Sequence, residues 1–167
     1  PAYLPGLTFS YFDASNGPTL LEAAQPALTP SLERPPIISR AAWGADESLR
    51  YDDQGKEIWP VEYQAVEHIV IHHTDTTNFE DPVLGLRLIY YYHAVTRGWG
   101  DIGYNYLVDF MGNVYEGRVG GENAVGGHAF QYNWGSAGIA TMGRYFDEPM
   151  TPEMRNGLTW ITAWAAR

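Results

Sequence analysis

Segments with the apolar pattern of β-strands alternate along the chain with segments patterned like α-helices, and this alternation limits the fold more than any other feature. The stretch His-Ile-Val-Ile-His at 68–72 predicts a buried strand. Strand-like runs follow at 104–109, 113–118 and 138–142, with a turn at 111–112 between the first two. Helices are predicted between these strands and after them. Interleaved strands and helices predict an α/β layer arrangement.

The two predicted helices have recognisable start signals. Asp81 precedes Pro82 as an N-cap before a first helical proline, and Gly98 is a natural stop for this helix. Thr151 precedes Pro152 in the same way. Apolar residues at helical spacing complete the pattern: Leu84, Leu88, Tyr91, Tyr92 and Val95 in the first helix, and Met154, Leu158, Ile161 and Ala165 in the second.

The first 36 residues differ from the rest, because they contain seven of the eleven prolines. This composition predicts an N-terminal extension or linker at 1–36, followed by one globular domain at 37–167. The formal charge of -10 excludes a field that would attract nucleic acid or an anionic membrane. No apolar run approaches the roughly 20 residues of a membrane helix. The absence of cysteine excludes thiolate chemistry and cysteine-bound metal within these residues.

The adjacent His72 and His73 are the first candidates for chemistry. Neighbouring side chains on a strand point to opposite faces, and His68 lies about 13 Å from His72 along the same face. This strand therefore offers at most one ligand to a zinc ion. A metal site would need ligands from elsewhere, and the alternative is two hydrogen-bonded histidines at a strand end. Ser136 lies in Gly-Ser-Ala-Gly, which is not the spacing of a serine hydrolase.

Several motifs together resemble the peptidoglycan recognition proteins and the related type 2 N-acetylmuramoyl-L-alanine amidases, which include the lysozymes of the phage T7 type. They occur in family order over about residues 37–167. They are Ile-Ser-Arg-Ala-Ala-Trp-Gly-Ala at 38–45, Val-Ile-His-His-Thr at 70–74, Tyr-His at 92–93, Arg-Gly-Trp-Gly-Asp-Ile-Gly-Tyr-Asn-Tyr at 97–106, Gly-Asn-Val-Tyr-Glu-Gly-Arg at 112–118, Gly-His-Ala at 127–129, Asn133, and Ser-Ala-Gly-Ile at 136–139.

This resemblance implies a central mixed β-sheet flanked by helices, with a groove on one face that holds a zinc ion at one end. It implies that His72 is the first zinc ligand and that Tyr104 is catalytic. The implied reaction is hydrolysis of the amide between N-acetylmuramic acid and L-alanine of peptidoglycan. Zinc can polarise the amide carbonyl and supply hydroxide, and a tyrosine hydroxyl can stabilise the oxyanion.

The resemblance also implies which residues contact the muropeptide in the groove. The contacts that carry over are His73, Thr74, His93, Arg97, His128 and Asn133, and the residues Gly98, Trp99 and Arg118 resemble the form that favours meso-diaminopimelate. An arginine suits this stem peptide because diaminopimelate has an additional carboxylate. The alternative for Arg118 is an ion pair, for instance with Glu116.

Catalytic members of the family supply two further zinc ligands after the last helix, so the resemblance implies that these ligands lie beyond Arg167. The alternative is a non-catalytic module that binds peptidoglycan. The substrate predicts a secreted or cell-wall-associated protein. The lack of cysteine favours a bacterial source, because animal members often contain disulfides. The sequence does not indicate an oligomeric state.

Overall fold

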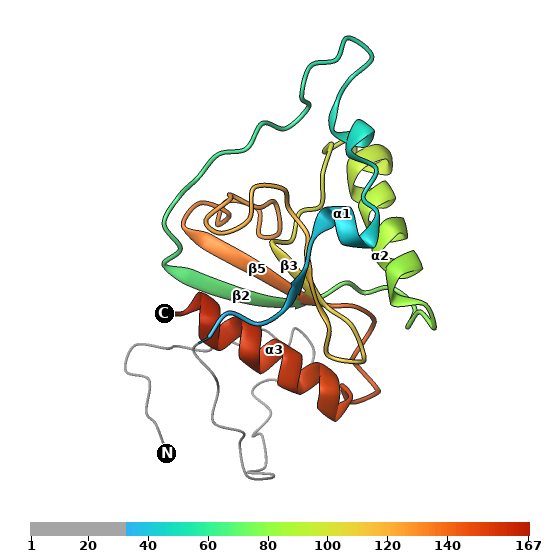
Figure 1. Ribbon diagram of the computed structural model, residues 1–167, viewed down its shortest axis with the longest axis vertical. Helices are drawn as coiled ribbons and strands as arrows, with labels where there is room; N and C mark the ends of the chain where they lie inside the picture. The colour runs from blue at the N-terminus through green and yellow to red at the C-terminus, as the bar shows by residue number, and fades with distance from the viewer. Residues whose placement is uncertain (1–32) are drawn as a thin grey trace.

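The computed structural model describes residues 33–167, which form a mixed five-stranded sheet with helices on both faces (Figure 1). The strands are β1 (Ile37–Ile38), β2 (His68–His73), β3 (Tyr106–Val108), β4 (Val114–Glu116) and β5 (Ser136–Thr141). Their order across the sheet is β1-β4-β3-β5-β2. β3 and β4 pair antiparallel, and the other three pairs are parallel. The predicted α/β class, with a central mixed sheet and flanking helices, is confirmed.

The helices begin where the start signals predict. α2 (Pro82–Tyr91) follows Asp81, whose carboxylate accepts hydrogen bonds from the amides of Val83 and Leu84. It continues as a π-helical turn, η2 (Tyr92–Thr96). α3 (Pro152–Ala165) follows Thr151, whose hydroxyl accepts from the Met154 amide. The short α1 (Arg40–Trp43) and the 3₁₀ turn η1 (Glu47–Arg50) come before β2.

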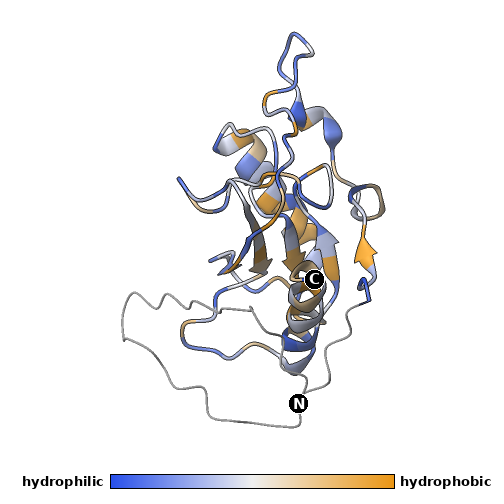
Figure 2. Cartoon of the chain, turned by 90° about the vertical axis from the view of Figure 1, so that its left-hand side faces the viewer, coloured by the Kyte–Doolittle hydropathy of each residue, from blue (hydrophilic) through white to orange (hydrophobic). Residues whose placement is uncertain are grey.

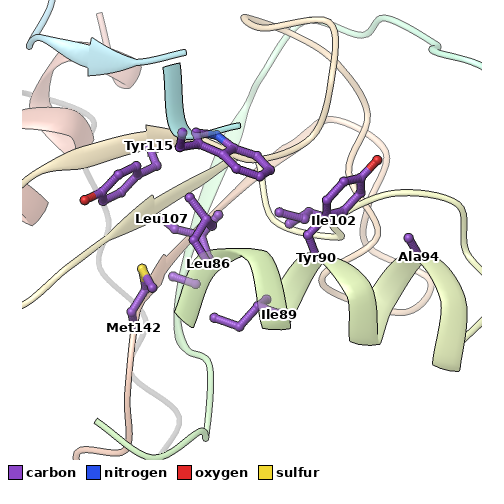
Figure 3. Packing of buried hydrophobic residues seen from close by; sticks show 10 residues of the cluster. Leu86, Ile89, Tyr90, Ala94, Ile102, Leu107, Tyr115 and Met142 are labelled. Atoms are coloured by element: carbon purple, nitrogen blue, oxygen red, sulfur yellow. The ribbon is translucent and has the colours of Figure 1, made fainter. Parts of the chain in front are cut away.

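Two apolar clusters fix these helices on opposite faces of the sheet. Leu107 packs with residues of α1 and α2, whereas its neighbours Tyr106 and Val108 pack with α3, as the alternation of a strand requires. Figure 3 shows the first cluster, in which Leu86, Ile89 and Tyr90 of α2 and Ala94 of η2 pack with Leu107 and Tyr115. The second cluster contains Met154, Leu158, Ile161 and Trp164 of α3.

The buried face of α2 is not the face that the apolar spacing predicts. Leu84, Leu88, Tyr91, Tyr92 and Val95 are all exposed, by 44–53% of their surface. The helix instead buries Leu86, Ile89 and Tyr90. Both stripes are apolar, so periodicity did not distinguish them.

β2 is an edge strand rather than the predicted buried one. Among the described strands it pairs with β5 alone, with His72 opposite Ala140. Its residues are half-buried or exposed, including Ile71 at 43% exposure. An apolar run does not by itself distinguish a central strand from an edge strand.

The predicted extension at 1–36 lies mostly outside the described residues. Of its last four residues, Glu33 and Arg34 contact α3. The Trp160 indole donates to the Glu33 carbonyl at 2.9 Å, and the Arg34 guanidinium lies 5.7 Å from the Trp164 ring. Within residues 33–167, no helix is long and apolar enough to cross a membrane.

Candidate functional site

A cluster of histidine and aromatic rings gathers where β2, β5 and the segment before β3 meet. His72 lies near the end of β2, with its ring centre 5.1 Å from that of His128 and 5.4 Å from that of Tyr104. His93, from η2, lies 5.5 Å from Tyr104 and 4.9 Å from Trp99. We call these five residues the histidine cluster. The structure thus brings together five residues that the sequence analysis selected from distant parts of the chain.

Hydrogen bonds orient the two central histidines. His72 Nε2 lies 3.0 Å from His128 Nδ1, and His128 Nε2 lies 3.3 Å from Ser136 Oγ. The Ser136 hydroxyl donates to the Tyr132 carbonyl at 2.6 Å, so it accepts from His128 Nε2. His128 Nδ1 is therefore the acceptor, and His72 Nε2 donates to it. Gly138 makes room for this arrangement, since a Cβ there would lie 2.3 Å from the His128 ring.

Burial keeps the histidines of the cluster neutral. It lowers the pKa of His128 to about 4, and the neighbouring His72 adds to this effect. The pKa of His72 is also lowered, chiefly by burial and then by His73. Burial, with the nearby charge of Arg97, lowers the pKa of His93 to about 4. Burial raises the pKa of the Tyr104 phenol, so its hydroxyl keeps its proton and can donate a hydrogen bond.

The pKa of His93 predicts a loss of stability in mild acid. It falls from 6.5 to about 4 on folding, so the contribution of the neutral ring is complete above about pH 6.5 and is lost as the pH falls toward 4. Protonation also removes the acceptor that Nδ1 offers to the Gly103 amide at 3.2 Å. We expect His93 to account for about 2 kcal/mol of destabilisation between pH 7 and pH 5.

The measurement is urea unfolding at several pH values for the parent chain and His93→Gln. The variant should show a shallower decline of unfolding free energy with acid, whatever its stability at pH 7. His68→Gln is the matched control, because His68 is exposed on the same sheet. If the unfolding free energy declined equally with acid in the parent chain and in His93→Gln, the stabilisation attributed to neutral His93 would be wrong.

A segment that precedes β2 covers the glycine-rich loop at 119–127. We call residues 58–67 the strap. The chain reaches it through a hydrophilic tip at the top of the view and then descends to the start of β2 (Figures 1 and 2). The Glu62 carbonyl accepts from the Val125 amide at 2.8 Å, and the Gln64 amide donates to the Asn123 carbonyl at 3.0 Å. A Cβ at Gly127 would lie 2.8 Å from the Trp59 ring.

The strap corrects the prediction for Arg118. Its side chain is fully buried and donates to the carbonyls of Trp59 and Pro60 at 2.9 and 3.0 Å, with the Trp59 ring 3.8 Å from the guanidinium carbon. Its Nη1 pairs with Asp101 at 2.8 Å. Arg118 therefore does not face a groove, and its ion-pair partner is Asp101 rather than Glu116. The strap is distant in sequence from Arg118, so the motif around Arg118 did not indicate that the strap would bury its side chain.

Asp101 is a residue that the sequence analysis did not single out. It is fully buried between two arginines, with one carboxylate oxygen 2.9 Å from Arg40 Nη1 and the other paired with Arg118. It also accepts from the Val119 amide at 3.0 Å and from the Ile102 amide at 2.8 Å. This carboxylate joins α1 and the glycine-rich loop to the segment that carries Tyr104, and Arg118 extends the connection to the strap.

Three other predicted contacts lie outside the cluster. His73 is on the opposite face of β2, where its Nδ1 accepts from the Tyr145 amide at 3.3 Å. The Thr74 hydroxyl lies 2.8 Å from that of Thr76 and accepts from the Gly143 amide. The Asn133 side chain accepts from the Ala129 amide at 2.7 Å and so braces its own loop. These side chains stabilise loops rather than line the cluster.

Arg97 and Gly98 lie beside the cluster on the surface. Both are exposed. Gly98 has a φ of 70°, a value that favours glycine, and it turns the chain from η2 toward Trp99. The Arg97 guanidinium lies 5.2 Å from the Trp99 ring. Arg97 is thus an accessible positive charge next to the histidine cluster.

The described residues do not complete a metal site. Within residues 33–167, no group of three or more His, Cys, Asp or Glu side chains is placed to hold a metal ion. His72 and His128 are adjacent, but tetrahedral zinc sites use three or four protein ligands. A pocket of about 380 Å³ near the ends of β2 and β5 is lined by Asp75, Asn78, Arg144 and neighbouring residues and does not include the cluster.

Comparison with known proteins places this geometry in a family. The family described as N-acetylmuramoyl-L-alanine amidase matches residues 62–167, which contain the whole histidine cluster. The chain belongs to this amidase family. The peptidoglycan recognition proteins are among its relatives, as the sequence motifs predict. Peptidoglycan-recognition protein LE of Drosophila melanogaster is 38% identical over 123 residues, which are 72% of this chain and 33% of that protein.

Further relatives show a similar degree of likeness to this chain. Human N-acetylmuramoyl-L-alanine amidase is 36% identical over 112 residues, covering 66% of this chain and 19% of its own length. A crystal structure of recognition protein LE with tracheal cytotoxin, a monomeric diaminopimelic acid-type peptidoglycan, superposes with a TM-score of 0.62 and 35% identity. That superposition covers 73% of this chain and 68% of the other. The chain spans a third or less of the two curated relatives. Both are animal proteins, so the bacterial source stays a prediction.

Proposed function

We propose that the chain binds peptidoglycan stem peptides at the histidine cluster and belongs to an enzyme that hydrolyses the amide between N-acetylmuramic acid and L-alanine. The observation that carries this proposal is the convergence of His72, Tyr104 and His128 within the segment that matches the amidase family. The Tyr104 hydroxyl can donate to the oxygen of the scissile amide as negative charge develops on it. A secreted or cell-wall location, where peptidoglycan lies, forms part of the same proposal.

The substrate class follows from groups beside the cluster. Stem peptides are anionic, and Arg97 offers an exposed guanidinium next to Trp99. We propose diaminopimelate-type peptidoglycan, which is the ligand in the structure of recognition protein LE. The preference would depend on Arg97, Gly98 and Trp99, because the charge of Arg118 is already paired with Asp101.

Zinc fits the described residues only in part. His72 is the proposed first ligand, and its imidazole is neutral at neutral pH, as metal binding requires. The remaining ligands would have to come from residues outside 33–167. In the family, bound zinc activates water for the hydrolysis. The roles proposed for Tyr104 and Arg97 are independent of the metal.

A recognition module that binds without turnover is the second candidate. The similarity to proteins named for peptidoglycan recognition favours it. Both candidates share the same ligand and the same cluster. They differ only in whether the amide is broken.

One experiment distinguishes the candidates. A diaminopimelate-type muropeptide is titrated into the full-length protein in a calorimeter, and release of free stem peptide is followed by chromatography with zinc or with a chelator. Binding with zinc-dependent release supports the amidase, and binding without release supports recognition. His72→Ala should abolish release, whereas His68→Ala, four residues earlier on the same strand, should not. Absence of binding would refute both candidates.

A further inference from the structure

The loop that follows His128 exposes three large aromatic side chains. Phe130, Tyr132 and Trp134 have 87%, 74% and 60% of their surface in contact with solvent. They occupy every second position of residues 129–134, which we call the aromatic loop. Single exposed apolar side chains are common on protein surfaces, but three in six residues form a concentrated apolar surface.

Hydrogen bonds hold the aromatic loop in one conformation. The Tyr132 amide donates to the Ala129 carbonyl at 2.7 Å, and the Ala129 amide donates to the Asn133 side chain at the same distance. The Ser136 hydroxyl donates to the Tyr132 carbonyl. Gln131 has a φ of 71°, which is uncommon for a residue with a side chain. A loop fixed in this way presents its rings with little ordering cost on binding.

The charge of the aromatic loop indicates the kind of ligand. Residues 129–135 read Ala-Phe-Gln-Tyr-Asn-Trp-Gly and contain no charged side chain. An anionic membrane or a nucleic acid would be met by Lys and Arg. Flat rings interspersed with amide side chains suit a neutral carbohydrate, whose C–H faces stack on aromatic rings and whose hydroxyl and acetamido groups accept and donate hydrogen bonds.

The position of the aromatic loop connects it to the histidine cluster. The loop begins directly after His128, which bonds to His72 and, through Ser136, to the loop itself. In the substrate of the proposed reaction, the scissile amide is attached to a sugar of the glycan strand. A stem peptide held at His72 and Tyr104 therefore brings its sugar, and the next sugars of the strand, close to the cluster.

We propose that the aromatic loop is a binding platform for the glycan strand of peptidoglycan. The rings of Phe130, Tyr132 and Trp134 would stack on the faces of successive N-acetylated sugars, in addition to the stem-peptide contacts at the cluster. This inference rests on the proposed function, because that function supplies the glycan as the substrate's other half. It concerns a protein surface that binds the glycan polymer, whereas the proposed function concerns the amide that is hydrolysed.

The test uses ligands without a stem peptide, so it is independent of amide hydrolysis. Chito-oligosaccharides and peptide-free glycan strands are titrated into the chain, and binding is followed by calorimetry and by tryptophan fluorescence. We expect the parent chain to bind both, and Trp134→Ala to weaken binding about tenfold or more. Phe130→Ala should also weaken it. Affinity for a free stem peptide, which carries no sugar, should change little in either variant.

Phe146→Ala is the matched control, since Phe146 is a comparably exposed aromatic residue, at 68%, in another loop. It should leave saccharide affinity unchanged. The proposal is overturned if the parent chain does not bind the peptide-free saccharides, or if Phe146→Ala weakens binding as much as Trp134→Ala. Loss of binding to phosphatidylcholine vesicles in the Trp134→Ala variant would assign the loop to a lipid surface and also overturn it. Muropeptide binding without saccharide binding would refute the platform but not the proposed function.

Discussion

Asp101→Ala is expected to destabilise the domain by about 3–5 kcal/mol, which is typical of removing one partner from a buried ion pair. The Asp101 carboxylate is 0% exposed and lies between Arg40 and Arg118, whose guanidinium groups are also buried. Without it, two buried positive charges face each other, and the Val119 amide loses its acceptor. Urea unfolding followed by tryptophan fluorescence measures the loss as a lower midpoint with an unchanged slope.

A surface ion pair provides the control for this prediction. Asp75 pairs with Arg144 at 2.6 Å, but both side chains are more than half exposed. Asp75→Ala should leave the unfolding midpoint unchanged within error, because solvent screens exposed pairs. Asp101→Asn keeps the shape of the side chain and should fall between the parent chain and Asp101→Ala. Similar midpoints for Asp75→Ala and Asp101→Ala would show that the Asp101 network does not stabilise the fold.

Tyr104→Phe is expected to lower the amidase kcat about 10²–10³-fold, the usual effect of removing one hydrogen-bond donor to an oxyanion. Its ring lies between those of His72 and His93, and burial raises the pKa of its phenol, so the hydroxyl remains a donor. Muropeptide affinity should change little, because the aromatic ring is retained. Initial rates of stem-peptide release, together with calorimetric binding, separate the two effects.

Tyr106→Phe is a closely matched control, two residues along the chain. Tyr104 precedes β3, whereas Tyr106 lies in β3 and packs on Trp164 in the cluster beneath α3. Its hydroxyl is thus remote from the reacting groups, and Tyr106→Phe should keep the parent rate. Equal losses in the two variants would indicate a general effect on folding rather than a role of Tyr104 in the reaction.

Local signals in the sequence predicted the parts of the fold that local chemistry determines. Asp81 with Pro82, and Thr151 with Pro152, start helices because their side chains accept from the first free amides. The antiparallel β3–β4 hairpin was likewise predicted by its turn. The edge position of β2 and the rotation of α2 were not, because each depends on which distant surface covers an apolar residue.

The residues of the candidate site likewise separate into those that local motifs predicted and those that depend on distant parts of the chain. His72, His93, Trp99, Tyr104 and His128 were selected from motifs, and the structure gathers them. For Arg118 the motif was misleading, because its environment is made by Trp59 and Pro60, nearly sixty residues earlier in the chain. No local pattern marks Asp101 as the centre of a charge network or Ser136 as the partner of His128.

The parallel pairing of β2 with β5 also has a consequence for how the chain reaches its native state. His68 pairs with Ser136, and Ile37 pairs with Val114, so both outer strands of the sheet join partners about seventy residues away. Such non-local topology slows folding, because a long loop must close before its contacts are made. During synthesis, β2 leaves the ribosome long before β5 exists. The strand that bears His72 therefore passes through a period in which both of its edges are unpaired and open to association with other chains, until residue 141 has emerged.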